Sequence, residues 1–307
     1  MTLISLVFAF LIEQLRPLPR VNPVHSLLAG YTNNVAGQFN AGERRQGVFA
    51  WLVAVLPWVL GVFLVHLLLD EASNVLSLAF NVAVLYFLIG FRQFAGSFNE
   101  ILDALRNEDT DAARQALAGW RNQSADELNS GEIAKLAIEN GLVDVHRHVF
   151  GVMFWFVVLP GPTGALLYFL SAMLVDGWGV RGGEDYIEFG GFARKAFEVL
   201  DWVPARLTAI TFAIVGNFED ALYCWRTQSN AWGDAGQGAV LAAGAGALGV
   251  RLGNAIHQDG TVVFRPELGL GDEADVNHMA AGMNLAWRSV LIWLFLIALV
   301  TLALWIG

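Results

Sequence analysis

Long apolar runs separated by short polar segments dominate this chain. The runs Val48–Leu69, Val75–Phe91 and Ala286–Ile306 are each long enough for a helix that crosses the roughly 30 Å of hydrocarbon in a bilayer. The segment Asp70–Asn74 between the first two runs is short and polar. It therefore predicts a turn that joins them as an antiparallel hairpin.

Two further apolar segments are less regular. Leu3–Leu15 stops at Arg16-Pro17, and neither a basic region before it nor a cleavage motif after it marks a signal peptide, so we expect a short retained helix. In Val149–Val175, Pro160-Gly161-Pro162 leaves two pieces that are each too short to cross a bilayer alone. The segment is either one kinked span or a pair of half-helices that enters and returns, and we favour the kink.

Polar residues concentrate in two regions, 92–148 and 176–285. In the first, apolar residues at helical spacing follow Asp109, and a second helix opens with Asn129 as cap and Glu132 three residues later, a variant of the capping box. We expect no strand-rich segment in the chain. The pattern predicts a single membrane domain over 1–307, with a polar helical loop at 92–148 and a small-residue signature region at 176–285.

Composition supports a membrane protein. Of the 307 residues 56% are hydrophobic and only 15% are charged, against about 25% charged residues in soluble domains, and the mean hydropathy is +0.51. The predicted fold is all-α and polytopic, with about 4–6 membrane-embedded helices, one of them broken at Pro-Gly-Pro, and amphipathic helices in the polar loops. The lipid bilayer is the first expected partner.

Charge and cysteine content exclude some functions and suggest an orientation. A net charge of −10 argues against a nucleic-acid partner, and the single cysteine, Cys224, excludes an intramolecular disulfide or a CxxC metal site. Arg16, Arg20, Arg44 and Arg45 make the first loop basic, which places it in the cytoplasm under the positive-inside rule. We expect a multi-pass protein of the bacterial inner membrane.

The stretch Ser229–Gly253 has an unusual composition. A Ser-Asn-Ala loop leads into a helical segment built almost wholly of Ala, Gly, Val and Leu, which ends in Gly-Val-Arg-Leu-Gly. Core packing to native density normally uses larger residues. Small residues here predict close backbone approach, either between helices or around a bound ligand.

Five segments, in order along the chain, resemble the CobD/CbiB family of adenosylcobinamide-phosphate synthases, which are membrane proteins of cobalamin assembly. Near the N-terminus, Leu18–Val24 is similar to the family's LPHPV pattern, with Asn22 in place of histidine. The other four segments are Asp109–Leu117, Pro160–Tyr168, Val203–Thr208 and Ala245–Gly253. The resemblance implies ATP-driven amide formation between adenosylcobyric acid and an aminopropanol-type amine, with Mg²⁺ neutralising polyphosphate charge.

A second branch of the same superfamily also resembles this chain. AmpE-like proteins, inner-membrane proteins associated with β-lactamase induction, carry a motif similar to Leu200–Leu207 and its continuation through Ala221-Leu222. The chain also departs from the synthase pattern where that pattern has acids. It has Trp120–Gln123 in place of a GRD segment, Val143–Arg147 in place of an acid-rich stretch, and Phe197-Glu198 in place of paired aspartates.

Two sets of polar residues are candidates for a site. Ligand-binding candidates are an arginine in each of two motifs, an aspartate near the first, and a Ser-Asn pair whose glycine-rich continuation can present N–H groups to an anion: Arg206, Arg251, Asp201, Ser229 and Asn230. Each has a structural alternative: a snorkelling or ion-paired arginine, or a small-residue packing face. The weaker magnesium candidates are acids in the polar regions: Glu139, Asp144, Asp176, Asp185 and Glu198.

Three functions follow from these observations. Because acids are missing where the synthases have them, we favour an AmpE-like regulatory or ligand-binding membrane protein, whose ligand is a corrinoid, a nucleotide or a cell-wall-derived molecule. The first alternative is an active, ATP- and Mg²⁺-dependent synthase of cobalamin biosynthesis. The second is a membrane scaffold protein, and a homo-oligomer is compatible with all three.

Overall fold

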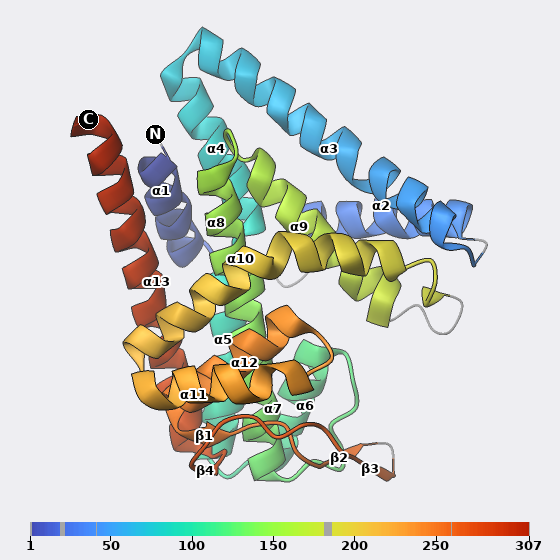
Figure 1. Ribbon diagram of the computed structural model, residues 1–307, viewed down its shortest axis with the longest axis vertical. Coiled ribbons are helices and arrows are strands. Elements are labelled where there is room, and N and C mark those ends of the chain that lie inside the picture. Colours follow the sequence, from blue (N-terminus) through green and yellow to red (C-terminus); the bar gives the residue numbers. More distant parts are fainter. Residues whose placement is uncertain (1, 19–21, 41, 181–185, 259, 307) are drawn as a thin grey trace. The chain divides into compact units, whose positions relative to one another are not determined.

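The computed structural model describes residues 2–18, 22–40, 42–180, 186–258 and 260–306, and most of them are helical (Figure 1). The α-helices in the first half of the chain are α1 (Thr2–Leu15), α2 (Pro23–Phe39), α3 (Arg44–Ala72), α4 (Asn74–Leu88), α5 (Phe91–Arg106), α6 (Thr110–Arg121) and α7 (Ser130–Val145). Those in the second half are α8 (Gly151–Val158), α9 (Thr163–Val175), α10 (Gly191–Val215), α11 (Phe218–Gln228), α12 (Ala235–Leu248) and α13 (Val276–Ile306). The all-α prediction is confirmed.

Four helical stretches are long and apolar enough to cross a membrane: Arg44–Ala72, Asn74–Arg106, Ser130–Val158 and Val276–Ala303. In the most apolar window of Arg44–Ala72 only 17% of the residues are buried inside the protein, and large apolar side chains such as Leu64 and Leu68 are exposed. Such a surface is compatible with lipid and unfavourable in water. The expectation of a polytopic membrane protein is therefore confirmed.

The predicted N-terminal elements form where the sequence places them. The first helix ends at Leu15, just before Arg16-Pro17, and it packs against α4. The turn between α3 and α4 shrinks to Ser73, whose hydroxyl accepts from the N–H of Val75 and caps α4. Because α3 and α4 also contact each other, they form the expected hairpin.

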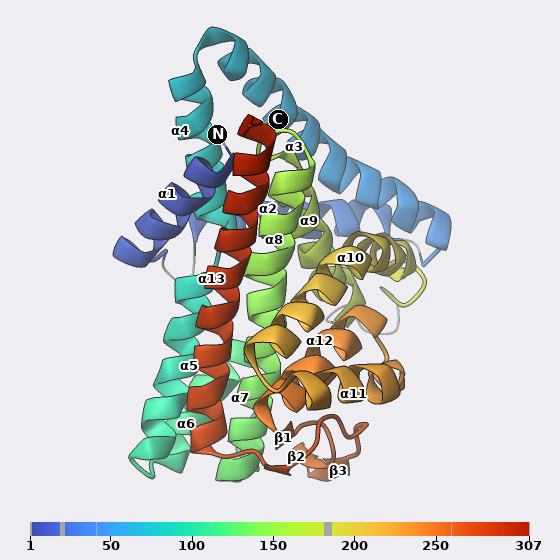
Figure 2. The ribbon, with the colours of Figure 1, turned by 60° about the vertical axis from the view of Figure 1, so that its left-hand side comes forward.

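The Pro-Gly-Pro segment differs from our expectation, because the chain reverses there instead of kinking. Helix α8 ends at Val158 and α9 begins at Thr163, and the two helices pack together (Figures 1 and 2). A Cβ on Gly164 would lie 2.2 Å from the carbonyl oxygen of Trp155, and one on Gly151 would lie 2.2 Å from the Tyr168 ring. Gly161 supplies the turn with a φ of +58°, a conformation that glycine adopts without strain.

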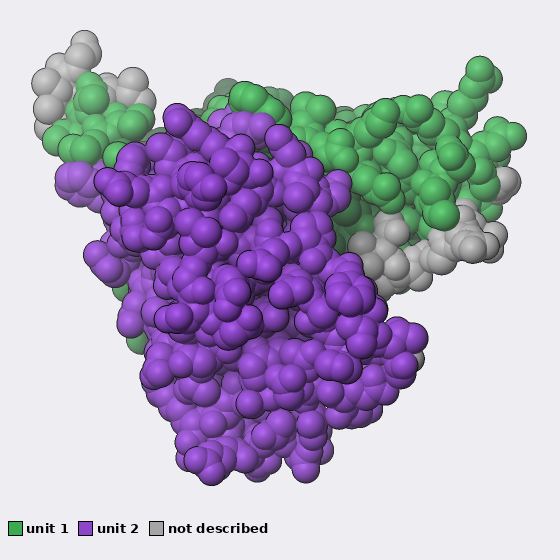
Figure 3. Space-filling model, turned by 60° about the horizontal axis from the view of Figure 1, so that its bottom comes forward, with its two compact units in different colours: residues 1–90, 147–202, 296–307 green, residues 91–146, 203–295 purple. Residues whose placement is uncertain are grey.

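The chain divides into two compact units (Figure 3). Unit 1 comprises Met1–Gly90, Arg147–Trp202 and Leu296–Gly307, and unit 2 comprises Phe91–His146 and Val203–Phe295. Unit 1 holds the α3–α4 and α8–α9 hairpins. Unit 2 holds the predicted amphipathic helices α6 and α7, with Asp109 capping α6 and Asn129 and Glu132 forming a complete capping box on α7.

The small-residue segment forms α12, which packs against both α7 and α11 in unit 2 (Figure 2). A Cβ on Gly246 would lie 2.5 Å from the carbonyl oxygen of Asp220 in α11, and one on Gly244 would lie 2.7 Å from the Leu142 side chain in α7. The predicted close backbone approach is confirmed. Gly249, in contrast, has no atom within 4 Å of its Cβ position and ends the helix in the left-handed conformation, with φ at +65°.

Four short strands follow α12, where we expected no strand-rich segment. Strand β1 (Val250–Arg251) pairs in parallel with β4 (Asp272–Glu273), and β2 (Ile256–Gln258) pairs antiparallel with β3 (Thr261–Val263). Each strand has only two or three residues, so the alternating pattern that identifies a strand in a sequence has no length in which to develop.

Candidate functional site

A buried carboxylate, Glu139 on α7, lies at the centre of a polar cluster in unit 2. It accepts a hydrogen bond of 2.7 Å from the backbone N–H of Gly253 and is held by two nitrogens of the Arg265 guanidinium, which also donates to the Gly253 carbonyl at 3.1 Å. Burying a carboxylate as deeply as Glu139 is costly unless it has such partners. Glu139, expected as a magnesium ligand, therefore fastens a loop to α7.

The backbone of that loop is tightly constrained. Gly253 has a φ of +70°, and a Cβ there would lie 1.8 Å from the carbonyl oxygen of Pro266. Beside it, Leu252 and Leu268 exchange two backbone hydrogen bonds of 2.7 and 3.0 Å. The final glycine of the sequence motif is thus required by the close approach of two loop segments.

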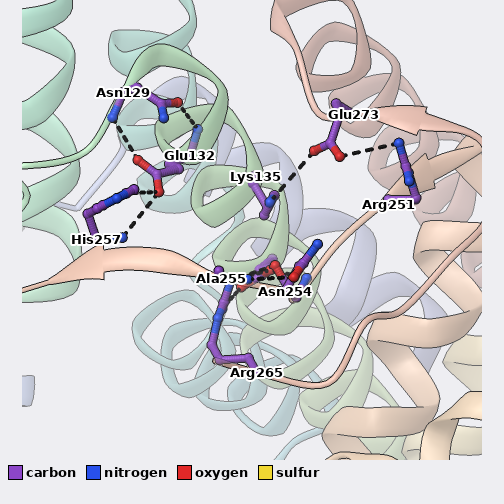
Figure 4. A network of polar contacts seen from close by, with 11 residues as sticks. Asn129, Glu132, Lys135, Arg251, Asn254, Ala255, His257, Arg265 and Glu273 are labelled. Atoms are coloured by element: carbon purple, nitrogen blue, oxygen red, sulfur yellow. Dashed lines mark hydrogen bonds and ion pairs between the residues drawn. The ribbon is translucent and has the colours of Figure 1, made fainter. Parts of the chain in front are cut away.

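A second acid of α7 binds the same loop region further along (Figure 4). Glu132 completes the capping box with Asn129 and also accepts from the backbone N–H of His257 at 3.1 Å and contacts its ring Nδ1 at 2.8 Å. This residue, expected only as a helix cap, also anchors β2.

A third residue of α7, Lys135, faces the parallel strand pair. Its ammonium lies 3.8 Å from a carboxylate oxygen of Glu273, and the other oxygen of that carboxylate lies 3.3 Å from the Arg251 guanidinium. Arg251 and Glu273 are register partners in the β1–β4 pair, which explains their proximity. Figure 4 shows Lys135 and Arg251 approaching Glu273 from different elements.

A fourth cation, Arg121 at the end of α6, faces Glu139 and Arg265. Burial lowers the pKa of its guanidinium, while the charge of Glu139 raises it and that of Arg265 lowers it. Arg121, Lys135, Arg251 and Arg265 thus outnumber the three carboxylates of the cluster, which are Glu132, Glu139 and Glu273. This excess of positive charge favours binding of an anionic ligand.

Of the expected ligand-binding residues, only Arg251 belongs to this cluster. Ser229 is buried and opens a short 3₁₀ turn in which its carbonyl accepts from Trp232, whereas Asn230 is exposed. Asp201 is buried and accepts a hydrogen bond of 2.6 Å from the Tyr168 hydroxyl in unit 1. Arg206 is half-buried on α10, and its predicted pairing with Asp201 stays a prediction.

The remaining magnesium candidates are dispersed. Asp144 accepts from the Trp120 indole at 2.9 Å, Asp176 pairs with Arg147 at 3.1 Å, and Glu198 is exposed on α10. Asp185 lies outside the described residues. No group of three or more acidic, histidine or cysteine side chains within the described ranges could hold a metal ion. The four described candidates do not gather at one place, and their role as magnesium ligands stays a prediction.

Sequence reasoning missed Lys135, Arg265, Arg121 and His257. A signal for the first was present, because Glu132, Lys135 and Glu139 follow each other at helical spacing in a mostly apolar helix and so share one face. Lys135 is also one of only two lysines in the chain. Arg265 lies in a loop and His257 in the three-residue strand β2, and neither segment is long enough to show a comparable signal.

Comparisons with known proteins support one of the candidate functions. The sequence model of the family described as CobD/Cbib protein matches residues 6–286. Cobalamin biosynthesis protein CobD of Stutzerimonas stutzeri is 35% identical over 301 residues, which cover 96% of each chain. The Chromobacterium violaceum protein of the same name is 36% identical over 212 residues, covering 69% of this chain and 67% of its own. No solved structure matches this chain.

These matches overturn the AmpE-like regulatory interpretation, since they favour the cobalamin-biosynthesis alternative. That prediction was wrong because it took the absence of acidic residues at the synthase positions as evidence that catalytic activity is absent. Asn122, in the segment compared with GRD, ends α6 in the left-handed conformation with φ at +53°, which asparagine tolerates well, and the neighbouring Arg121 lies in the cluster. In this chain, therefore, that position serves as a helix end.

Proposed function

Because this chain belongs to the CobD/CbiB family, we propose that it is an adenosylcobinamide-phosphate synthase, a membrane enzyme of cobalamin biosynthesis. Its reaction joins the carboxylate of adenosylcobyric acid to an aminopropanol-type amine in an ATP-driven amide bond. The observation that carries the proposal is the 35% identity to a cobalamin biosynthesis protein over 96% of both chains. A match of that length includes both compact units.

The polar cluster of unit 2 suits such a reaction. When ATP drives amide formation, one carboxylate oxygen leaves attached to phosphorus, and negative charge accumulates on phosphate oxygens. Preorganised cations stabilise this charge most effectively where water is restricted. Lys135 is buried and Arg121 and Arg265 are largely covered, so their charges act through a medium less polar than bulk water.

We place the protein in the bacterial inner membrane with the first loop in the cytoplasm, where ATP is present. This orientation rests on Arg16, Arg44 and Arg45, which flank the first apolar helices. The proposal gives no role to AmpE-like regulation.

Complementation tests the proposal directly. A bacterium that lacks its own synthase and needs cobalamin for growth is supplied with cobyric acid and the amine, and carries this gene or an empty vector. We expect growth only with the gene. Absence of growth, with the protein detected in the membrane fraction, would contradict the proposal.

A biochemical assay then separates chemistry from transport. Detergent-purified protein is incubated with adenosylcobyric acid, the amine, ATP and Mg²⁺, and the product is identified by mass spectrometry as the sum of acid and amine less one water. We expect no product when a non-hydrolysable ATP analogue replaces ATP. Product formed without any nucleotide would exclude the ATP-driven reaction.

A further inference from the structure

The ion pairs around Glu273 are incomplete. The Lys135 ammonium lies 3.8 Å from the Glu273 carboxylate, beyond hydrogen-bond distance, and has no other partner among the described residues. The buried Nε of Arg251 likewise has no hydrogen-bond partner there, although another nitrogen of the same guanidinium lies 3.3 Å from Glu273. Two cations therefore share one carboxylate and retain unused donors.

The neighbouring pair provides a comparison. Glu139 and Arg265 form a two-pronged contact, supplemented by the Gly253 N–H. The Nε of Arg265, like that of Arg251, has no hydrogen-bond partner among the described residues, but the same loop and the same helix bring Arg265 and Glu139 to hydrogen-bond distance through two nitrogens. The longer distances from Lys135 and Arg251 to Glu273, 3.8 and 3.3 Å, are therefore specific to these two pairs.

Glu273 itself is poorly fixed. Its side chain is 63% exposed and lies on a strand of two residues, whereas the Lys135 side chain is only 9% exposed. An exposed carboxylate contributes little to stability through such a pair. In contrast, burying a lysine this deeply costs desolvation free energy unless a counter-charge compensates its ammonium group. Lys135 is therefore held more firmly than Glu273, and Arg251, whose side chain is 42% exposed, is intermediate.

We propose that Lys135 and Arg251 form a binding site for a phosphate group, and that the Glu273 carboxylate competes with this phosphate for both cations. A phosphate offers three acceptor oxygens and more negative charge than a carboxylate, so it can satisfy the Lys135 ammonium and the Arg251 Nε together. The ligand is the polyphosphate of a nucleotide. That last assignment rests on the proposed function, whereas the phosphate chemistry does not.

The test is pyrophosphate binding to the full-length protein in nanodiscs of zwitterionic lipid, measured by isothermal titration calorimetry. We expect Lys135→Gln and Arg251→Gln each to weaken binding at least tenfold. Glu273→Gln should strengthen binding about threefold to tenfold, because it removes the competing charge. Lys195→Gln, at the other lysine of the chain and exposed on α10, is the matched control and should leave binding unchanged.

The Glu273 variant keeps the proposal falsifiable even if Lys135→Gln fails to fold, since an exposed Glu→Gln change should not disturb the structure. Equal or weaker pyrophosphate binding in Glu273→Gln would overturn the competition. No binding by the wild-type protein, or binding insensitive to both cation variants, would overturn the site.

A second arm identifies the source of the phosphate. Nanodiscs containing phosphatidylglycerol should leave pyrophosphate affinity nearly unchanged if the ligand is soluble. A large loss of affinity that depends on Lys135 and Arg251 would support the phosphate site but overturn its assignment to a nucleotide, because a lipid headgroup would then be the occupant. Binding with these properties in a protein that fails complementation would uphold the site and reject the proposed function alone.

Discussion

The backbone N–H of Gly253 donates to the Glu139 carboxylate over 2.7 Å and so fastens the loop after α12 to the middle of α7. The two residues are 114 positions apart in the sequence. Because Arg265 binds the same carboxylate and the Gly253 carbonyl, one acid holds two segments of the loop. The position of Arg251, between Gly253 and α12, depends on this contact.

Glu139→Gln should destabilise the protein. The amide can still accept from Gly253, but the guanidinium of Arg265, whose side chain is only 17% exposed, loses its counter-charge. We expect a loss of about 2–4 kcal/mol, somewhat below the cost of breaking a fully buried pair. Thermal unfolding of the detergent-purified protein measures the effect.

Glu127→Gln is the matched control, since Glu127 also accepts a backbone N–H, that of Gly260, but at an exposed position. It should shift the melting temperature little. If both variants lowered the melting temperature equally, the contribution of Glu139 to stability would not depend on its burial.

Gly246→Ala should destabilise the packing of α12 on α11. The added Cβ would lie 2.5 Å from the Asp220 carbonyl oxygen, so backbone must move, at a cost of about 1–3 kcal/mol. Gly249→Ala should cost about 1–2 kcal/mol through its positive φ alone, because its Cβ would contact nothing. The melting temperatures of the two variants measure these costs.

Gly119→Ala in α6 provides the opposite control, because its Cβ position is empty and its conformation is helical. We expect it to stabilise the protein by about 0.5–1 kcal/mol. A stabilising effect of Gly246→Ala would contradict the close approach described for α12.

The fold was predictable where one strong physical constraint acts on many consecutive residues. The length needed to cross a bilayer identified α3, α4 and α13, and the spacing of apolar residues and caps identified α6 and α7. The reversal at Gly161 was not predictable in this way, because a kink and a hairpin use the same turn residues. What distinguishes them is the fit of Gly164 against Trp155, which is a tertiary contact.

The site was less predictable. Arg251 was identified because it lies in a recognisable motif, but its partner Glu273 comes from β4, and the second cation on that carboxylate, Lys135, comes from α7. Sequence spacing cannot reveal that Glu139 meets Arg265 across 126 positions. A buried acid that binds an arginine and one that binds a metal look alike in a sequence, and only the geometry separates them.

Cys224 should be unreactive in the folded protein. Burial raises the pKa of its thiol to about 11, with a further contribution from the charge of Asp220, so the nucleophilic thiolate is scarce at neutral pH. We expect no maleimide labelling of the native protein at pH 7.5 and full labelling after denaturation. Rapid labelling of the native protein would show that α11 opens readily.

This property permits a topology experiment without replacing Cys224. Cysteine introduced at Asn40 or at the exposed Gln123 should resist an impermeant maleimide in intact cells and react after permeabilisation. The basic first loop is predicted to be cytoplasmic, and the α3–α4 hairpin is expected to return region 92–148 to the same side. Gln123 is preferred to Asn122, whose φ of +53° disfavours cysteine. Labelling of either position in intact cells would reverse the orientation.

The first turn of α13 should become less stable at low pH. Burial alone would raise the pKa of Asp275, but hydrogen bonds from His278 and Asn277 lower it below its ordinary value. Asp275 therefore contributes stability above about pH 4 that is lost as the pH falls through its folded pKa. Melting temperatures measured from pH 7 to pH 3 should fall less steeply for Asp275→Asn than for the wild type, whereas Asp272→Asn, at an exposed carboxylate, should follow the wild type.

The small side chains of α12 also bear on how the nascent chain is sorted. With 14 residues the helix is about 21 Å long, too short for a bilayer, and most of it is enclosed by protein. Membrane insertion is favoured chiefly by Leu, Ile, Phe and Val, and alanine and glycine predominate here. A segment that becomes as buried as any core helix can thus pass the insertion machinery without being inserted as a transmembrane span.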